Sequence, residues 1–395
     1  MSSKTSPRKT APAKPQAAGP ETTLTWEQVL AWRMQRQHLA RRASRDQMLD
    51  VVGDICGLHA QLMSSAEIAL WARVDGLAPE AVQRALWEER TLLKTWAVRG
   101  TLHLLPSSEY PLWQAALSTY RHYTKGVWLR HAGFTPEGLE QFVQAVHDAL
   151  EGPPLTREEL AVAVAELTGS AELGDKVRGS WGSVLKPAAF RGLLCFAPGE
   201  GNSVRFTRPD RWLSPWESLD PQEARRTVFL RYIAAKGPLT EDAIQHWWAG
   251  ITAAQTRKLI HSLGEAVLPV SIEGSPAWAA ADQLAGVKAA SPAGVVRLVP
   301  AFDQYILGAE RVLPDLLLPA PLRSRVYRPQ AWISPVLLVD GRMVGVWKHV
   351  RKGKTVTVGI EPFSPLPPAI RDAAAAEAED LARFLGGRLQ LNWTA

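Results

Sequence analysis

One pattern of residues occurs twice in the middle of this chain and limits the folds that it can adopt. Residues 152–160 and residues 237–244 each contain Gly-Pro, then Leu-Thr, then acidic residues at the start of a helical stretch. In each copy the threonine can cap a helix, and the acidic residue in the first turn resembles a capping box. The chain therefore contains two related units, each with a capped helix.

Each capped helix is followed by a second, basic helix and then by two strands. The second helices are expected over about residues 176–191 and 252–262, and each leads into an apolar strand, a turn and another strand. The glycine-bearing turns are expected at residues 198–203 and 273–276. This order is that of a winged helix, in which the second helix usually faces a DNA groove.

A similar unit is implied near the N-terminus, over residues 25–106. Ser44 is a candidate N-cap, and the helical pattern continues over residues 70–87. Residues 92–98 and residues 102–106 are apolar stretches on either side of a Gly-Thr step. They predict a strand, a tight turn and a strand, as in the other two units.

The composition becomes rich in strand-forming residues after Gly294. Residues 295–300 form one expected strand, and two apolar runs flank Asp340 and Gly341. An Asp-Gly step between apolar runs is a strong hairpin signal. Residues 355–358 predict a further strand, and the Ala/Glu-rich residues 369–385 predict the last helix.

These patterns predict an α+β protein of three tandem winged-helix modules with a C-terminal β-rich part. The expected divisions are a disordered basic leader (1–22), three modules (23–150, 151–220 and 221–290) and the C-terminal part with the final helix (291–395). The leader is rich in Lys, Pro, Ala and Ser and cannot bury enough surface to order itself. It is either a basic arm that contacts DNA phosphates or a plain disordered segment.

The chain is basic, with a net charge of +6 and a pI near 9.4. Winged helices also mediate protein contacts, but the positive charge favours a nucleic-acid partner. Cys56 and Cys195 lie among apolar neighbours and are expected to be buried free thiols in a reducing compartment. The N-terminal residues lack a secretory signal, and no stretch approaches a membrane helix, so a cytoplasmic protein is expected.

One segment carries the most informative polar residues. The sequence shows no metal motif, phosphate-binding glycine loop or nucleophile elbow, so no cofactor is expected. In residues 57–73, His59 and Gln61 alternate with apolar residues. In an extended segment these two side chains point the same way and can hold one water between them.

Residues 57–73 and 94–103 resemble the family of winged-helix DNA glycosylases typified by AlkZ and YcaQ. The later matches are residues 300–308 and residues 339–347, and the resemblance covers nearly everything from about residue 25 to residue 393. The Arg-Gly-Thr-Leu-His and Phe-Asp signatures, in this order, make the resemblance specific.

The resemblance implies a fold and an activity. Members of the family are monofunctional glycosylases built as three tandem winged helices with a C-terminal β-rich part, in a C-shaped architecture with a concave basic surface. They release N7-alkylated guanines, and some unhook interstrand crosslinks. For this chain the resemblance implies a DNA-repair enzyme of the bacterial cytoplasm and nucleoid. It is expected to act as a monomer on alkylated or crosslinked double-stranded DNA without a cofactor.

The resemblance also assigns the catalytic motif, which in the family is Gln, an apolar residue, then Gln or Asp. Gln61 matches the second position, but His59 occupies the first. A neutral His59 can accept a hydrogen bond from the attacking water and can take its proton, since an unperturbed pKa near 6.5 lies close to the working pH. A protonated His59 would repel a cationic sugar, which predicts a loss of activity in acid between about pH 5 and 8. The alternative for His59 is a hydrogen-bonded core histidine.

The other signature residues have two interpretations each. Arg99, Thr101 and His103 either contact DNA phosphate or the lesion, or they brace the first module. Asp303 either orients a catalytic group at the DNA or ties the β-rich part to the first module. Trp347 either closes the pocket over the lesion or belongs to the core.

Lys348, Arg351, Lys352 and Lys354 form a basic turn after an expected strand. They predict a hairpin that contacts the duplex backbone, with a solvated loop as the alternative. For the whole chain the competing function is a winged-helix transcription regulator or another non-catalytic DNA-binding protein. A family member that has lost activity through His59 is a third alternative.

Overall fold

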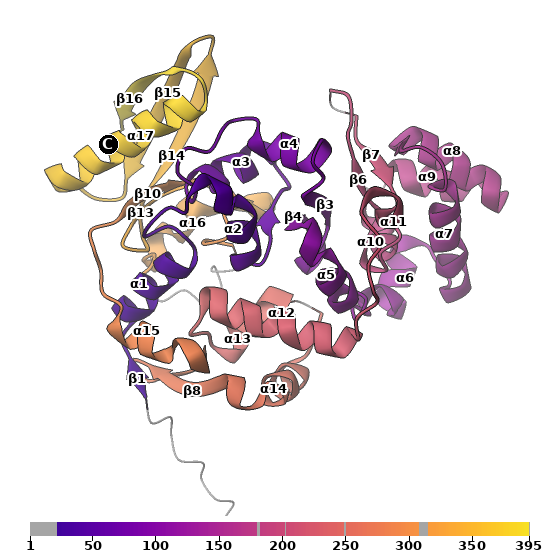
Figure 1. Ribbon diagram of the computed structural model, residues 1–395, viewed down its shortest axis with the longest axis horizontal. Helices are drawn as coiled ribbons and strands as arrows, with labels where there is room; N and C mark the ends of the chain where they lie inside the picture. Colours follow the sequence, from indigo (N-terminus) through magenta and orange to yellow (C-terminus); the bar gives the residue numbers. More distant parts are fainter. Residues whose placement is uncertain (1–21, 180–181, 202, 249, 308–314, 395) are drawn as a thin grey trace, which may run out of the picture.

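The computed structural model describes residues 22–179, 182–201, 203–248, 250–307 and 315–394. The predicted leader therefore lies outside the described residues, except for Thr22. The described chain is a mixture of helices and small sheets, as expected for an α+β protein (Figure 1). No helix in these ranges is both long enough and apolar enough to cross a membrane.

The first unit places three helices and three strands around the segment of interest. It contains α2 (Met48–Asp54), β2 (Leu58–His59), α3 (Met63–Trp71), α4 (Ala81–Trp87), β3 (Leu92–Trp96) and β4 (Leu102–Pro106). The strands pair in the order β2-β4-β3. The predicted strand, turn and strand are confirmed, and Arg99 and Gly100 make the turn with positive φ angles of 59° and 68°. Ser44 is the N-cap of the single 3-10 turn that leads into α2, as predicted.

The second unit has the same order of elements. It contains α7 (Pro136–Ala149), β5 (Leu155–Thr156), α8 (Arg157–Thr168), α9 (Ala171–Gly179), α10 (Lys186–Phe190), β6 (Cys195–Ala197) and β7 (Arg205–Thr207). Thr156 caps α8 in a reciprocal capping box with Glu159, as the sequence predicted. Helix α7 packs against α8 and α10, so this unit begins near residue 136, before the predicted division at residue 151.

The prediction of one continuous second helix over residues 176–191 is wrong. Helix α9 ends at Gly179, and α10 begins at Lys186 with Pro187 in its first turn. Gly182 lies between them with a φ of 83°, which a helix cannot contain. A side-chain methyl group at position 182 would also collide with the ring of Trp96, so the close approach of β3 requires glycine here.

The third unit repeats the order once more. It contains α12 (Pro221–Lys236), α13 (Glu241–Trp248), α14 (Ala253–Ser262), β8 (Val267–Ile272) and β9 (Ser275–Ala280). Thr252 caps α14 with Gln255 in a capping box. A bridge between Leu239 and Trp278 takes the place of the short strand, and β1 (Thr23–Leu24) runs parallel to β8. In all three units the short strand after the first helix pairs with the last strand.

The C-terminal part is one five-stranded sheet covered by one long helix. Its strands β10 (Val296–Val299), β13 (Val336–Val339), β14 (Arg342–Lys352), β15 (Thr355–Pro362) and β16 (Arg388–Trp393) pair in that order, and α17 (Pro368–Phe384) packs on them. The predicted hairpin at Asp340 and Gly341 and the predicted last helix are confirmed. Strands β14 and β15 extend as a hairpin beyond α17 at the upper left of Figure 1.

The remaining elements connect these parts. They are α1 (Trp26–Arg36), α5 (Tyr110–Leu117), α6 (Gly126–Ala132), α11 (Pro209–Trp212), α15 (Leu284–Ala289), α16 (Arg323–Val326), β11 (Tyr327–Arg328) and β12 (Trp332–Ile333). Helix α5 packs against α12, which joins the first and third units. The core of the first unit is also continuous with that of the C-terminal sheet. In Figure 1 the first unit accordingly lies between the C-terminal part and the second unit.

Candidate active site

His59 and Gln61 lie at the end of strand β2, just before helix α3. The main chain stays extended through Ala60, whose N–H donates to the carbonyl of Leu102 at 2.7 Å. Ala60 is fully buried, whereas His59 and Gln61 both line a pocket of about 520 Å³. The alternation seen in the sequence therefore brings these two side chains into one cavity.

The walls of this candidate catalytic pocket come from three distant segments. They are the turn between β3 and β4, the segment after β10 and the β11–β12 hairpin, which contribute Arg99, Thr101, Phe302, Leu307, Tyr327, Arg328, Gln330, Ala331, Trp332 and Ile333. Gln330 and Ala331, in the β11–β12 turn, have positive φ angles of 60° and 57°. The pocket is thus assembled from tight turns, where side chains can be aimed out of regular structure.

Phe302 forms one wall directly against His59. Their rings stack with centroids 5.5 Å apart, and the edge of Trp332 meets Phe302 at 5.1 Å. Phe302 has a φ of 58°, a conformation that a bulky residue adopts only when the surrounding contacts impose it. The two residues that follow it supply those contacts.

Asp303 is buried behind the pocket and paired with Arg73. Its two carboxylate oxygens accept hydrogen bonds from the Arg73 guanidinium at 2.7 Å each, and both side chains are fully buried. Gln304 donates from Nε2 to the carbonyl of Gly57, next to β2. The carboxylate of Asp303 therefore does not reach the pocket, and the pair ties the C-terminal part to the end of α3.

His59 is held in its neutral form. Burial, followed by the charge of His103 and of Arg99, lowers the pKa of His59 to about 3. Its Nδ1 is buried with no hydrogen-bond partner among the described residues. The expectation that His59 titrates near pH 6.5 is therefore wrong, because the sequence pattern did not show that two turns and Phe302 would shield the ring from water.

His103 supports His59 from the neighbouring strand. The two residues are paired across β2 and β4, and their rings meet edge to face at 5.6 Å. Nδ1 of His103 lies 3.0 Å from the carbonyl oxygen of Thr101, and burial lowers its pKa to about 4. His103 is buried and does not line the pocket, whereas Thr101 and Arg99 do.

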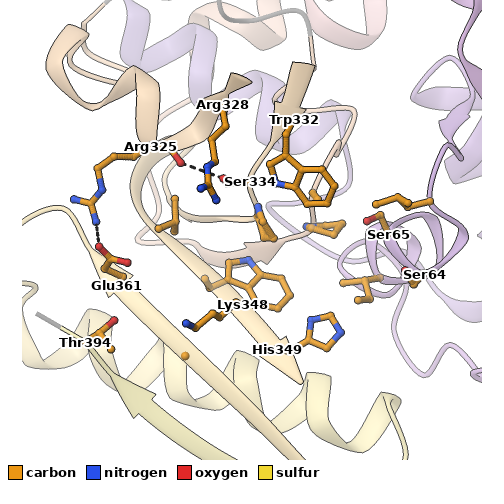
Figure 2. A pocket seen from close by; sticks show the side chains of 18 of the residues that line it. Ser64, Ser65, Arg325, Arg328, Trp332, Ser334, Lys348, His349, Glu361 and Thr394 are labelled. Carbon is orange, nitrogen blue, oxygen red and sulfur yellow. Dashed lines mark hydrogen bonds and ion pairs between the residues drawn. The ribbon is translucent and has the colours of Figure 1, made fainter. Parts of the chain in front are cut away.

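A second cavity of about 690 Å³ adjoins the candidate catalytic pocket and shares Arg328 and Trp332 with it. Figure 2 shows Ser64 and Ser65 of α3 on one side and Lys348 and Glu361 on the other. Trp347 also lines this cavity, but it is buried and its Nε1 donates to the carbonyl of Val299 at 2.9 Å. Trp347 is thus a core residue that contributes to the cavity wall.

Arg351, Lys352 and Lys354 lie at the far end of the β14–β15 hairpin. All are exposed, and none of them lines either cavity. Lys348, nearer the base of the hairpin, lines the larger cavity. The basic turn predicted from the sequence is therefore a true β-hairpin with its cations in solvent.

Comparison with known proteins decides the family. Residues 52–384 match the family model described as DNA glycosylase AlkZ-like. The chain is 36% identical over 366 residues to the interstrand DNA cross-link repair glycosylase of Streptomyces sahachiroi, covering 92% of this chain and 97% of that protein. The chain belongs to the AlkZ-like DNA glycosylase family.

A solved structure agrees with this assignment. The Streptomyces sahachiroi DNA glycosylase AlkZ matches with a TM-score of 0.86 and 35% sequence identity, over 94% of this chain and 100% of that chain. The AlkZ-like chain is accordingly an enzyme, and the competing interpretation as a non-catalytic transcription regulator is not favoured.

Sequence reasoning missed three residues of this AlkZ-like site. Phe302 lies in a signature segment but was given no role, and Arg328 and Trp332 were not noticed. Arg328 and Trp332 lie more than 260 positions from His59 in the sequence, and the hairpin that carries them turns through residues with left-handed backbone. The only local signal for this part of the site is that Arg328 and Trp332 flank a Pro-Gln-Ala turn.

Proposed function

We propose that this AlkZ-like enzyme hydrolyses the N-glycosidic bond of N7-alkylated guanine in duplex DNA and leaves an abasic site. The observation that carries the proposal is that His59 and Gln61, both neutral, line one pocket at the end of β2. The resemblance of the sequence assigns the family's catalytic motif to these two positions. Neutral hydrogen-bonding groups suit a reaction whose leaving group already carries positive charge.

The reaction needs no proton for the leaving base. When the bond between N9 and C1′ breaks, its electron pair goes to the alkylguanine and cancels the positive charge of the base. The sugar becomes electron-poor, and the oxygen of a water molecule bonds to C1′. Gln61 accepts a hydrogen bond from that water through its side-chain oxygen, and a ring nitrogen of His59 accepts another.

His59 orients this water and does not deprotonate it in advance. A ring with a pKa of about 3 is a weak base, so it stays unprotonated at neutral pH and does not take a proton from water in advance. It can still accept a hydrogen bond, which fixes the position of the water oxygen. The proton that the water loses passes on to solvent after the new bond has formed.

The three repeated units are winged-helix modules in this proposal. Their shared order of elements and shared strand pairing support this part of the proposal. The three modules and the C-terminal part together enclose the DNA in a C shape. The hairpin cations Lys348, Arg351 and Lys352 contact phosphates and position the duplex. A single chain binds the DNA, and the enzyme works on the bacterial chromosome in the cytoplasm.

The relative from Streptomyces sahachiroi is named for interstrand cross-link repair. We extend this to the present chain, so that it also unhooks a crosslink by releasing one of the two joined guanines. The same bond is cut in both reactions. The larger cavity beside the catalytic pocket offers room for more than a methyl group.

The first test compares base release by the parent protein and by three variants. We expect Gln61→Ala and His59→Ala to lose about 100-fold or more in single-turnover release of 7-methylguanine from a methylated duplex, because each removes a group that positions the water. His59→Gln is the matched variant, because it restores the family's residue, and it should retain activity. Equal rates in the parent and in both alanine variants would remove the pair from catalysis.

A further inference from the structure

The catalytic pocket has an unusual charge for the reaction assigned to it. Among its described lining residues none carries a carboxylate, and two, Arg99 and Arg328, carry a positive charge. The nearby carboxylate of Asp303 is buried and neutralised by Arg73. Over the part of the chain that the structure describes, the groups that line a pocket proposed to stabilise a cationic sugar are therefore neutral or positive.

The transition state nevertheless needs negative charge close to it. Enzymes that pass through oxocarbenium-like sugars usually place a carboxylate beside the ring. Duplex DNA itself carries one negative charge per nucleotide on each strand, so the substrate can supply this charge. What the protein must then do is hold particular phosphates near the sugar.

Both arginines are available for this task. Neither guanidinium has a hydrogen bond or an ion pair with another described residue. Arg325, on α16 three residues before Arg328, is by contrast paired with Glu361. In Figure 2 Arg328 points into the cavity, whereas Arg325 turns away toward Glu361. Arginine is well suited to a phosphate, because its N–H groups match the phosphate oxygens in pairs.

Helix α3 adds a second set of donors at the larger cavity, which Arg328 also lines. It starts directly after Gln61 and Leu62, it has no side-chain cap, and the amides of its first turn have no acceptor among the described residues. Ser65 in that turn is 9% exposed, lines the larger cavity and has no hydrogen-bond partner in the described chain. Free amides and the positive end of the helix dipole favour an anion there.

We propose that Arg99, Arg328 and the N-terminus of α3 bind the DNA phosphates that flank the lesion, and that these phosphates supply the negative charge that stabilises the cationic sugar. This inference rests on the proposed function. Arg99 and Arg328 are then positioning residues, which act on the sugar through the phosphates they hold. The backbone of the substrate takes the place of a catalytic carboxylate.

The test uses a duplex in which single phosphates have been made neutral. The lesion strand contains one guanine among thymines, with no adenine or cytosine, so that methylation at N7 before annealing gives a single 7-methylguanine. One methylphosphonate linkage is placed in turn at each position from two nucleotides before the lesion to two after it. The single-turnover rate of base release and the affinity of the protein for the duplex are measured separately for each position of the linkage.

We expect one or two neutral linkages next to the lesion to reduce the single-turnover rate about 10-fold or more, with a smaller change in affinity. Arg328→Ala should show a similar loss on the unmodified duplex and little further loss on the sensitive methylphosphonate duplex. Arg328→Lys should recover part of the rate. Arg383→Ala is the control, because Arg383 is on α17 and lines neither cavity.

Rates within twofold of the unmodified duplex for every neutral linkage would overturn the inference. It would also be overturned if Arg328→Ala slowed release from the sensitive methylphosphonate duplex by the same factor as from the unmodified duplex. Glu310→Gln belongs in the same series, because Glu310 lies outside the described residues. If Glu310→Gln lowered the rate of base release and no methylphosphonate linkage changed that rate, the negative charge would be assigned to a carboxylate. Failure of the parent to release base from the unmodified duplex would instead contradict the proposed function.

Discussion

At the scale of single residues, the site depends on histidines that stay neutral. His59 and His103 have pKa values lowered to about 3 and about 4, chiefly by burial, and neither pairs with a carboxylate in the described ranges. A histidine activated as a base would need such a partner or more exposure to water. The pair at His59 and Gln61 therefore resembles the two neutral amides found in the family motif more than it resembles a histidine base.

The rate of base release should accordingly be independent of His59 titration between pH 5 and 8. The reason is that His59 is already neutral at pH 5, two units above its pKa. Single-turnover rates of the parent and of His59→Gln should have parallel pH profiles in this range. An acid loss in the parent that is absent from His59→Gln would show that His59 titrates in this window.

The same two histidines should make the fold sensitive to acid. In the unfolded chain each histidine binds a proton below about pH 6.5, whereas in the folded chain it does so only near pH 3 or 4. The free energy of unfolding should thus be fully retained above pH 6.5 and decrease below it, by up to about 1.4 kcal/mol per pH unit for each histidine. Urea titrations at several pH values measure this, and His59→Gln should show the smaller dependence.

At the scale of elements, local signals predicted much of the fold. The predicted capping residues Thr156, Thr240 and Ser44 and the Asp340-Gly341 turn fix helix starts and a hairpin through contacts within a few residues. The break between α9 and α10 and the parallel pairing of β15 with β16 were not foreseen, because both depend on tertiary neighbours. His59 and Gln61 follow from alternation along one strand, whereas Arg328 reaches the pocket only through the folded chain.

The junction between α3 and the C-terminal part should depend on the Arg73–Asp303 pair. Asp303→Asn leaves the guanidinium of Arg73 buried with a neutral partner, and we expect it to reduce the free energy of unfolding by about 3–5 kcal/mol. The combined change Arg73→Met with Asp303→Leu removes both charges and should be less destabilising than Asp303→Asn alone. Denaturant titrations of the parent and the two variants measure this, and a double variant that is destabilised as much as Asp303→Asn, or more, would contradict the prediction.

At the scale of the whole molecule, the fold places a basic hairpin beside the two cavities of the candidate site. The β14–β15 hairpin carries cations in solvent, and its base forms a wall of the larger cavity. Under the proposed function, a duplex contacted by the hairpin passes beside the pocket. The proposal thus assigns the positioning of the DNA to the hairpin and the chemistry at the sugar to the pocket.

Removal of the hairpin cations should weaken binding without slowing chemistry. The triple variant of Arg351, Lys352 and Lys354 to alanine should bind undamaged and methylated duplex less tightly, and the slope of log affinity against log salt should decrease by about 0.9 for each lost phosphate contact. Its single-turnover rate at saturating protein should match the parent rate. A loss of rate at saturation would place the hairpin in the catalytic step.

The most direct test of the account is to identify the products formed from a duplex with a single 7-methylguanine. Mass spectrometry should find the free methylated base and an intact strand with an abasic site, and that strand should break only after treatment with alkali. This result would establish hydrolysis of the N-glycosidic bond without strand cleavage. No free base, together with tight, salt-sensitive binding to undamaged duplex, would contradict the assignment of the pocket at His59 and Gln61 as a glycosylase site for this lesion.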